Sequence, residues 1–257
     1  MPTVVMTHGA FCGGWAFDVF RAPFEAAGWT VHTPDLPGHG SGHGSGGGAG
    51  SVAGLSMRDY AKALETFCAD LPETPVLLGH SLGGLVTQMA ARRVKSRGVV
   101  LLAPSAPWGV SGSSIEEAVT ALGVSVADPF WTGKVAPDRS IMRMHSLDRV
   151  PREARDEILD RLVPESGRAV REVLNWWLDP FMTTSVGMGP LPCPSLAIAG
   201  QRDVVHPAGT VRQTAERIGA TFQVMPGMSH WLIGETGWEA VADLTLAWMA
   251  SEAAAAA

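Results

Sequence analysis

The segment that most constrains this chain is Val76–Leu85, which reads VLLGHSLGGL. Apolar residues typical of a buried strand precede Gly-x-Ser-x-Gly, and residues 85–92 continue at a helical period. A chain with 30 glycines can produce this pentapeptide by chance, and a flexible loop is the alternative interpretation. The flanking patterns favour a tight strand-to-helix turn, in which glycines give neighbouring elements room and the Ser81 hydroxyl is exposed as a nucleophile.

The composition predicts one globular domain with an insertion. The chain has 257 residues, 46% of them hydrophobic, so it can bury a large core. Its net charge is −6 without long runs of like charge, which disfavours nucleic acid or an anionic membrane as a partner. No basic leader precedes the first strand, and no run reaches the ~18 apolar residues of a membrane span. We therefore expect a cytoplasmic protein, with Cys12, Cys68 and Cys193 as free thiols.

Short apolar runs predict a mostly parallel sheet of about six strands with helices on both faces. The expected strands are residues 3–7, 29–34, 76–78, 99–103, 195–200 and 221–225. The expected helices flanking them are residues 15–27, 56–69 and 238–250, with Ser56 and Asp59 forming the N-terminal cap of the second.

The alternation of strand and helix is lost between residues 104 and 192, where we find helical patterns only, at 114–122, 151–163 and 164–178. We expect residues 1–104 and 192–257 to form an α/β core domain and residues 105–191 an inserted helical cap. Most of the large apolar side chains in the cap must form its own core, yet a lid over an apolar cleft needs the same residue types. The candidate substrate contacts are Trp108, Trp131, Met144, Trp176 and Trp177 in the cap, and Trp231 outside it.

Three polar side chains follow expected strands in an informative order. Ser81 comes first, Asp203 follows the strand at 195–200, and His230 follows the last strand. Open α/β sheets build their sites at the carboxyl ends of strands, and Ser, Asp, His is the chain order of a catalytic triad on one such fold. A surface carboxylate and a structural histidine are the alternative interpretations of the last two residues.

The other histidines are interpreted as structural. His8, His80, His145 and His206 do not follow the last strand. His39 and His43 lie in a glycine-rich stretch that lacks carboxylates or thiols to complete a metal shell, so we expect a mobile surface loop there rather than a metal site.

The motifs GHSLG at 79–83, GQRD at 200–203 and MSH at 228–230 resemble the α/β-hydrolase superfamily over essentially the whole chain. Within it, HGAFCGGW at 8–15 and the helical cap are similar to small esterases related to plant methyl-salicylate esterases and hydroxynitrile lyases. The resemblance implies an α/β-hydrolase fold and a serine carboxylesterase that acts on a small or medium ester with an apolar part.

The chemistry of a serine carboxylesterase implies a role for each of these residues. His230 would take the proton of Ser81 as general base, and Asp203 would orient and stabilise the imidazolium. The backbone N–H groups of Leu82 and Ala10 would bind the oxyanion, with Phe11 as the other candidate for the second donor.

Departures from the motifs of related enzymes disfavour some of the reactions that this fold catalyses. Dehalogenases and epoxide hydrolases of this fold carry Asp where Ser81 stands, and hydroxynitrile lyases carry Lys where Trp231 stands. Cofactor-free perhydrolases, C–C or amide hydrolases and non-enzymatic ligand receptors on this fold remain alternatives. We expect no cofactor and no metal, a small-molecule ester as the partner, and leave open whether the chain forms a homodimer.

Overall fold

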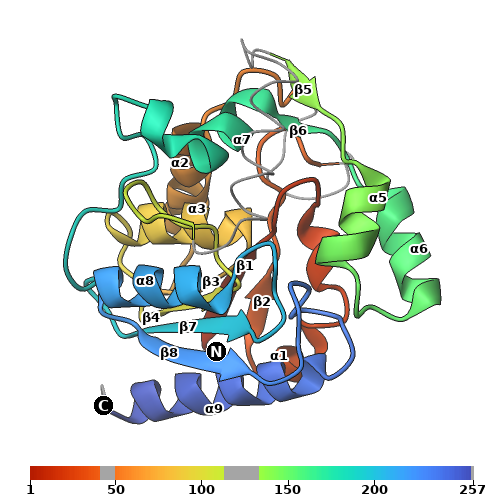
Figure 1. The fold of residues 1–257 in the computed structure, drawn as a ribbon. Helices are drawn as coiled ribbons and strands as arrows, with labels where there is room; N and C mark the ends of the chain where they lie inside the picture. Colours follow the sequence, from red (N-terminus) through yellow and green to blue (C-terminus); the bar gives the residue numbers. More distant parts are fainter. Residues whose placement is uncertain (41–49, 113–132, 256–257) are drawn as a thin grey trace.

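A six-stranded parallel sheet forms the centre of the computed structural model, which describes residues 1–40, 50–112 and 133–255 (Figure 1). The strand order is β2-β1-β3-β4-β7-β8, and every neighbouring pair is parallel. The strands are β1 (Thr3–Thr7), β2 (Thr30–His32), β3 (Val76–His80), β4 (Gly98–Leu102), β7 (Ser195–Gly200) and β8 (Thr221–Met225). The predicted fold class is confirmed.

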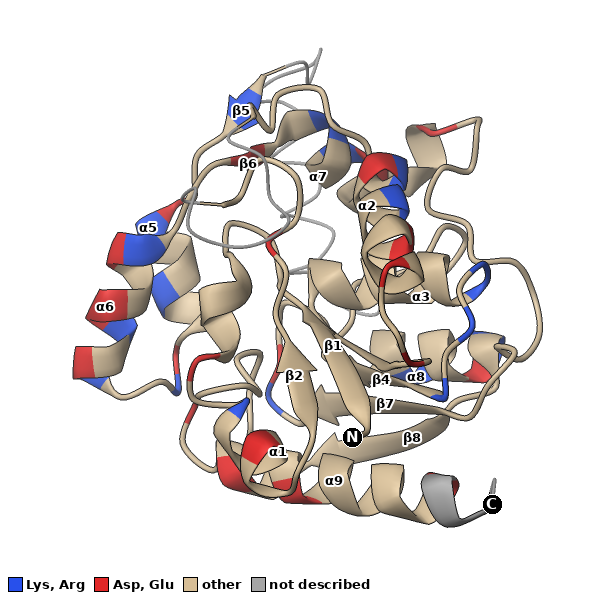
Figure 2. Cartoon of the chain, turned by 180° about the vertical axis from the view of Figure 1, so that it is seen from behind, with Lys and Arg blue, Asp and Glu red and all other residues tan. Residues whose placement is uncertain are grey.

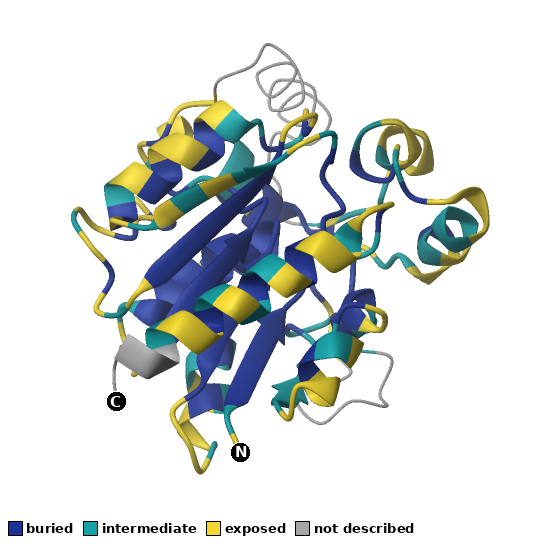
Figure 3. Cartoon of the chain, turned by 90° about the horizontal axis from the view of Figure 1, so that it is seen from below, coloured by how far each residue is buried: buried dark blue, intermediate teal, exposed yellow. Residues whose placement is uncertain are grey.

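The four central strands, β1, β3, β4 and β7, are mostly apolar because both faces of the sheet are covered there. β1, β3, β4 and β7 are buried along their whole length, and none of the six strands contains a charged residue. In Figure 2 the positions of charged residues are coloured on the surrounding helices and loops, and Figure 3 shows the buried strands between partly exposed helices.

Helices cover the two faces of the sheet separately. The core on one face contains side chains from α2 (Met57–Ala69), α3 (Leu82–Ala91) and α8 (Ala208–Ile218). The core on the other face contains side chains from the N-terminal segment around α1 (Ala22–Ala26) and from α9 (Trp238–Ala255).

The prediction of one helix over residues 15–27 is wrong. A 3-10 helix, η1 (Gly14–Phe17), is followed by a separate α1, in which Pro23 lies in the first turn. Proline lacks an N–H group and its ring clashes with a preceding turn, so it starts a helix more readily than it continues one. The predicted cap of α2 is present, because Ser56 and Asp59 form a reciprocal capping box.

The segment between β4 and β7 contains strands as well as helices. Its described elements are β5 (Lys134–Val135), α5 (Arg139–Ile141), the π-helix η2 (Met142–Ser146), α6 (Arg152–Arg161), β6 (Glu165–Ser166), α7 (Gly167–Leu174) and the 3-10 helix η3 (Trp176–Leu178). β5 and β6 pair antiparallel, so the expectation of helices alone is wrong. The helix expected from residue 164 starts at Gly167 because Ser166 caps it, its hydroxyl accepting from the Ala169 N–H. The helix predicted at 114–122 lies outside the described residues.

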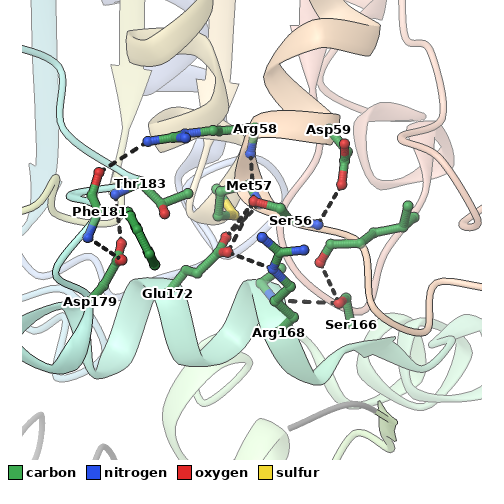
Figure 4. A network of polar contacts seen from close by, with 12 residues as sticks. Ser56, Met57, Arg58, Asp59, Ser166, Arg168, Glu172, Asp179, Phe181 and Thr183 are labelled. Atoms are coloured by element: carbon green, nitrogen blue, oxygen red, sulfur yellow. Dashed lines mark hydrogen bonds and ion pairs between the residues drawn. The ribbon is translucent and has the colours of Figure 1, made fainter.

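The α7 helix is fixed to α2 by a buried carboxylate (Figure 4). Glu172 accepts hydrogen bonds from the Ser56 hydroxyl and the Met57 N–H, both at 2.8 Å, and from Arg168 Nε at 2.9 Å. Since the N-terminus of a helix carries partial positive charge, it stabilises this carboxylate. The segment between β4 and β7 is therefore tied to α2 by hydrogen bonds to this buried side chain.

A second buried carboxylate lies in the loop between β8 and α9. Glu235 is fully buried, and its Oε1 accepts from the Ser229 N–H at 2.6 Å while Oε2 has no hydrogen-bond partner in the described structure. Burial, with the charge of Asp148 adding to it, raises the pKa of Glu235 from 4.5 to about 7. Glu235 is therefore largely protonated below neutral pH.

We predict that Glu235→Gln becomes more stable relative to the natural protein as the pH rises from 5 to 8, by about 1–2 kcal/mol. Because its pKa is raised in the folded state, the natural carboxyl costs stability as it loses its proton, whereas glutamine does not titrate. Urea unfolding at both pH values measures this, with the exposed Glu239→Gln of α9 as the control. An equal difference in unfolding free energy at both pH values would contradict the raised pKa.

Candidate active site

Ser81 lies in a strained turn between β3 and α3. Its backbone has φ 54° and ψ −124°, a region that non-glycine residues rarely adopt. Close packing surrounds the turn, because a Cβ atom on Gly83 would lie 2.2 Å from the carbonyl oxygen of Thr7, and one on Gly79 would lie 2.4 Å from that of Gly83. Only glycine allows these backbones to approach, as the sequence pattern indicates.

The three predicted triad side chains meet at the carboxyl edge of the sheet. His230 Nε2 lies 3.1 Å from Ser81 Oγ, and His230 Nδ1 lies 2.9 Å from Asp203 Oδ2. All three residues are buried, although they come from segments far apart in the chain. The arrangement has the geometry of a hydroxyl nucleophile, a base and an orienting carboxylate.

Asp203 is held as a carboxylate. Burial opposes its ionisation, but the charge and hydrogen bond of His230 outweigh burial and lower the pKa of Asp203. Its other oxygen accepts the backbone N–H groups of Val205 and His206, both at 2.8 Å. Because an ionised carboxylate only accepts, His230 Nδ1 must carry the proton, and its Nε2 is free to accept from the Ser81 hydroxyl.

The turn after β1 lies beside the nucleophile and holds the other predicted backbone donors. A Cβ atom on Gly9 would lie 3.1 Å from the Ser81 Cβ atom. Leu82 is the first residue of α3, so its N–H has no acceptor within the helix. The Phe11 N–H, in contrast, donates to Glu165 Oε2 at 3.4 Å. Of the two candidates for the second oxyanion donor, Ala10 is therefore favoured over Phe11.

Two buried histidines flank His230. His80 Nε2 donates to the backbone oxygen of His230 at 2.9 Å, and His206 pairs with the Ser105 hydroxyl at 2.9 Å. Their ring centroids lie 5.0 and 5.2 Å from that of His230. Burial, with the charge of His230 adding to it, lowers the pKa of His80 to about 3 and that of His206 to about 4. Both rings are therefore neutral around neutral pH.

Three of the predicted substrate contacts pack against one another. Trp108, Trp176 and Trp177 make successive edge-on ring contacts, with centroids 5.4 and 6.1 Å apart. Met144 lies in η2 and is 59% exposed. Trp231 packs in the hydrophobic core with its ring against His80, which makes it a core residue in this structure. Trp131 lies outside the described residues.

Sequence reasoning missed a buried cluster behind the turn after β1. Glu165 is fully buried and accepts from His39 Nε2 at 2.9 Å and from the Tyr60 hydroxyl at 2.5 Å. The prediction of a mobile surface loop is wrong for His39, which is 4% exposed, while His43 lies outside the described residues. No local signal marks this pair, because 126 residues separate His39 from Glu165.

The described residues contain no helix that is long and apolar enough to cross a membrane. Within the same residues, no group of three or more histidine, cysteine, aspartate or glutamate side chains is placed to hold a metal ion.

Comparisons with known proteins agree with the fold. A pyrethroid hydrolase of Sphingobium wenxiniae is 36% identical over 81 residues, which span 32% of this chain and 27% of that protein. Salicylic acid-binding protein 2 of Nicotiana tabacum is 30% identical over 112 residues, or 43% of this chain and 42% of that protein. These two alignments thus span less than half of either relative.

The structure of the methylesterase MES16 from Arabidopsis matches 96% of this chain and 98% of its own with a TM-score of 0.69, at 19% identity. The model of the alpha/beta hydrolase family matches residues 4–244. The resemblance seen in the motifs is therefore confirmed, and this chain belongs to the alpha/beta hydrolase family.

Proposed function

We propose that this chain is a serine hydrolase that cleaves a small to medium carboxylic ester with an apolar part through an acyl-enzyme. The observation that carries the proposal is the continuous contact from Ser81 Oγ through His230 to Asp203, at 3.1 and 2.9 Å. The relatives and structural neighbours named as esterases and hydrolases support the predicted class, a carboxylesterase-type hydrolase.

In the first half of the proposed reaction, His230 Nε2 removes the Ser81 proton while Oγ attacks the ester carbonyl carbon. The carbonyl oxygen becomes an oxyanion, which the N–H groups of Leu82 and Ala10 bind. When the tetrahedral intermediate collapses, the bond to the alcohol breaks and His230 gives its proton to the departing oxygen. Asp203 stabilises the imidazolium that exists between these two transfers.

In the second half, water replaces the alcohol. His230 removes a proton from water, the hydroxide oxygen attacks the acyl carbon, and collapse releases the carboxylic acid and returns the proton to Ser81. The neutral rings of His80 and His206 support this cycle, because a second charged imidazole beside His230 would make it harder to protonate.

We further propose that residues 105–191 act as a cap that contributes to substrate selection. The ring contacts among Trp108, Trp176 and Trp177 support this proposal, since they gather large apolar surface in the inserted segment. Trp176 is half-buried, whereas Trp177 is exposed, so Trp176 is the better candidate for a substrate contact.

We predict that Ser81→Ala lowers kcat on a nitrophenyl ester by about 10⁶-fold, the size of effect seen when a nucleophile is removed from a triad that acts as a unit. Alanine fits the turn and removes only the Oγ atom, so the melting temperature should stay near that of the natural protein. Rapid mixing of the natural protein should show a burst of nitrophenol equal to the enzyme concentration. Normal turnover in the alanine variant would mean that another residue is the nucleophile.

We predict that Asp203→Asn lowers kcat by roughly 10⁴-fold with little change in fold, because an amide favours the wrong tautomer of His230 and cannot stabilise its charged form. Steady-state kinetics on the same ester measures this. Near-normal turnover would assign the orienting carboxylate to another residue and leave the assignment of Ser81 intact.

We predict that Trp176→Ala changes the preference for acyl-chain length more than it changes kcat/KM on the shortest ester. Removing a large side chain enlarges an apolar surface that only longer substrates reach. A panel of nitrophenyl esters of rising chain length measures this, with the exposed Leu178→Ala of η3 as the control. An equal loss on every ester would show that Trp176 belongs to the core of the cap.

A further inference from the structure

The turn that carries the proposed oxyanion donor is hydrogen-bonded to residues 163 and 165 of the inserted segment. The Phe11 N–H donates to Glu165 Oε2 at 3.4 Å, and the Phe11 carbonyl accepts from the Val163 N–H at 2.9 Å. Phe11 has φ 64°, a conformation that costs a non-glycine residue free energy unless its surroundings fix it. Residues 163 and 165 thus hold both polar groups of the strained residue next to Ala10.

Glu165 brings a charge to this position. Its carboxylate lies within hydrogen-bond distance of a peptide group adjacent to the Ala10 N–H, which in the proposed function binds a developing negative charge. An unpaired carboxylate there would destabilise the oxyanion, because buried charges are poorly screened. His39 Nε2, at 2.9 Å from Glu165 Oε2, is the group placed to compensate it, and both side chains are fully buried.

We propose that His39 and Glu165 form a positioning pair for the oxyanion turn, in which Glu165 fixes the Phe11 backbone and protonated His39 cancels the charge of Glu165. This inference rests on the proposed function, because it assigns the pair to the same site.

The titration behaviour of the two groups supports the pair. Burial pulls the pKa of His39 down, but the hydrogen bond and charge of Glu165 outweigh burial and raise it above 6.5. Burial likewise opposes ionisation of Glu165, but the hydrogen bond and charge of His39 outweigh burial and lower its pKa below 4.5. Both groups are therefore charged in the pH range between the pKa of Glu165 and that of His39 in the folded protein. As the pH rises through the pKa of His39, the imidazole loses its charge and the ion pair is lost.

Among the residues that the structure describes, the other titratable groups that face His39 or Glu165 carry no compensating charge. His8 faces it from the turn after β1 with ring centroids 5.1 Å apart, and burial followed by the charge of His39 lowers the pKa of His8 to about 4. Tyr60 faces it from α2 at 5.6 Å, and burial together with Glu165 raises the pKa of Tyr60. Burial and Glu165 also raise the pKa of the Cys12 thiol. His8, Tyr60 and Cys12 are thus neutral around neutral pH, which leaves His39 as the cation beside Glu165.

Four variants separate charge from packing. His39→Gln keeps an N–H donor for Glu165 but removes the positive charge of His39. Glu165→Gln keeps an acceptor for the Phe11 N–H but removes the negative charge of Glu165. The double variant, with both substitutions, carries neither charge. Glu172→Gln is the matched control, because Glu172 is also a buried carboxylate of the inserted segment but contacts α2 rather than the oxyanion turn.

We expect His39→Gln to lower kcat on a nitrophenyl ester by about tenfold with little change in KM, the order expected for one nearby unit charge in a medium of intermediate dielectric constant. The double variant should recover most of this loss, and Glu172→Gln should leave kcat within about twofold. Affinity for a trifluoromethyl ketone, whose adduct carries an oxyanion, should change in parallel with kcat. A double variant as slow as His39→Gln, or slower, would overturn the electrostatic role.

The pH dependence gives a second readout. In the natural protein, kcat should fall as the pH rises through the pKa of His39, because the pair then becomes negative, and this fall should be absent in the double variant. The same alkaline fall in the double variant would contradict the inference.

A nuclear magnetic resonance titration of His39 tests the pair without reference to catalysis. We expect a His39 pKa above its ordinary value in Ser81→Ala, and a lower one when Glu165→Gln is added. An equal His39 pKa in both backgrounds would overturn the pair even if Ser81 is the nucleophile. Turnover retained in Ser81→Ala would instead refute the proposed function, so the two failures are distinguishable. If His39→Gln does not fold, this titration decides the inference.

Discussion

The strained backbone of Ser81 is the constraint on which the rest of the site depends. Holding a serine at φ 54° costs about 1–3 kcal/mol, and the turn persists because β3 and α3 are packed on both sides of it. That packing leaves room only for glycine at position 83, where the backbone meets the carbonyl of Thr7. The same contact brings β1 and the turn after it against the nucleophile. The position of the proposed oxyanion donor at Ala10 thus follows from the geometry of the strand-to-helix turn.

The strands of the main sheet carry no charged residue, and two buried carboxylates near the proposed site, Asp203 and Glu165, each have partners that stabilise their charge. Asp203 is stabilised by His230 and two backbone N–H groups, and Glu165 by His39 and Tyr60. Glu235 accepts one backbone N–H, but its other oxygen has no hydrogen-bond partner in the described structure, and burial raises its pKa to about 7. The ionised groups therefore lie where the proposed chemistry requires them, and the cost of burying them is met by hydrogen bonds rather than by water.

The sequence was sufficient for the features that local patterns encode. Short strand patterns, continuously apolar in the central strands, predicted all six strands of the main sheet. The residues that follow those strands predicted which side chains would meet, Ser81, Asp203 and His230. The inserted segment was harder, because strands as short as β5 and β6 leave no periodicity to detect. His39 was misplaced because its partner, Glu165, lies in that segment, and only the tertiary fold brings the two together. Pro23 was the signal that could have divided the predicted helix at 15–27.

Mass spectrometry of the protein after reaction with a fluorophosphonate tests the roles of Ser81 and His230, because this reagent forms a stable adduct with an activated serine. We expect one equivalent of label per chain, on the peptide that contains Ser81. We expect no label at that position in His230→Ala, because serine is a poor nucleophile without an adjacent base. A label on a different residue, or unchanged labelling of Ser81 without His230, would contradict the assignment of Ser81 and His230 as nucleophile and base.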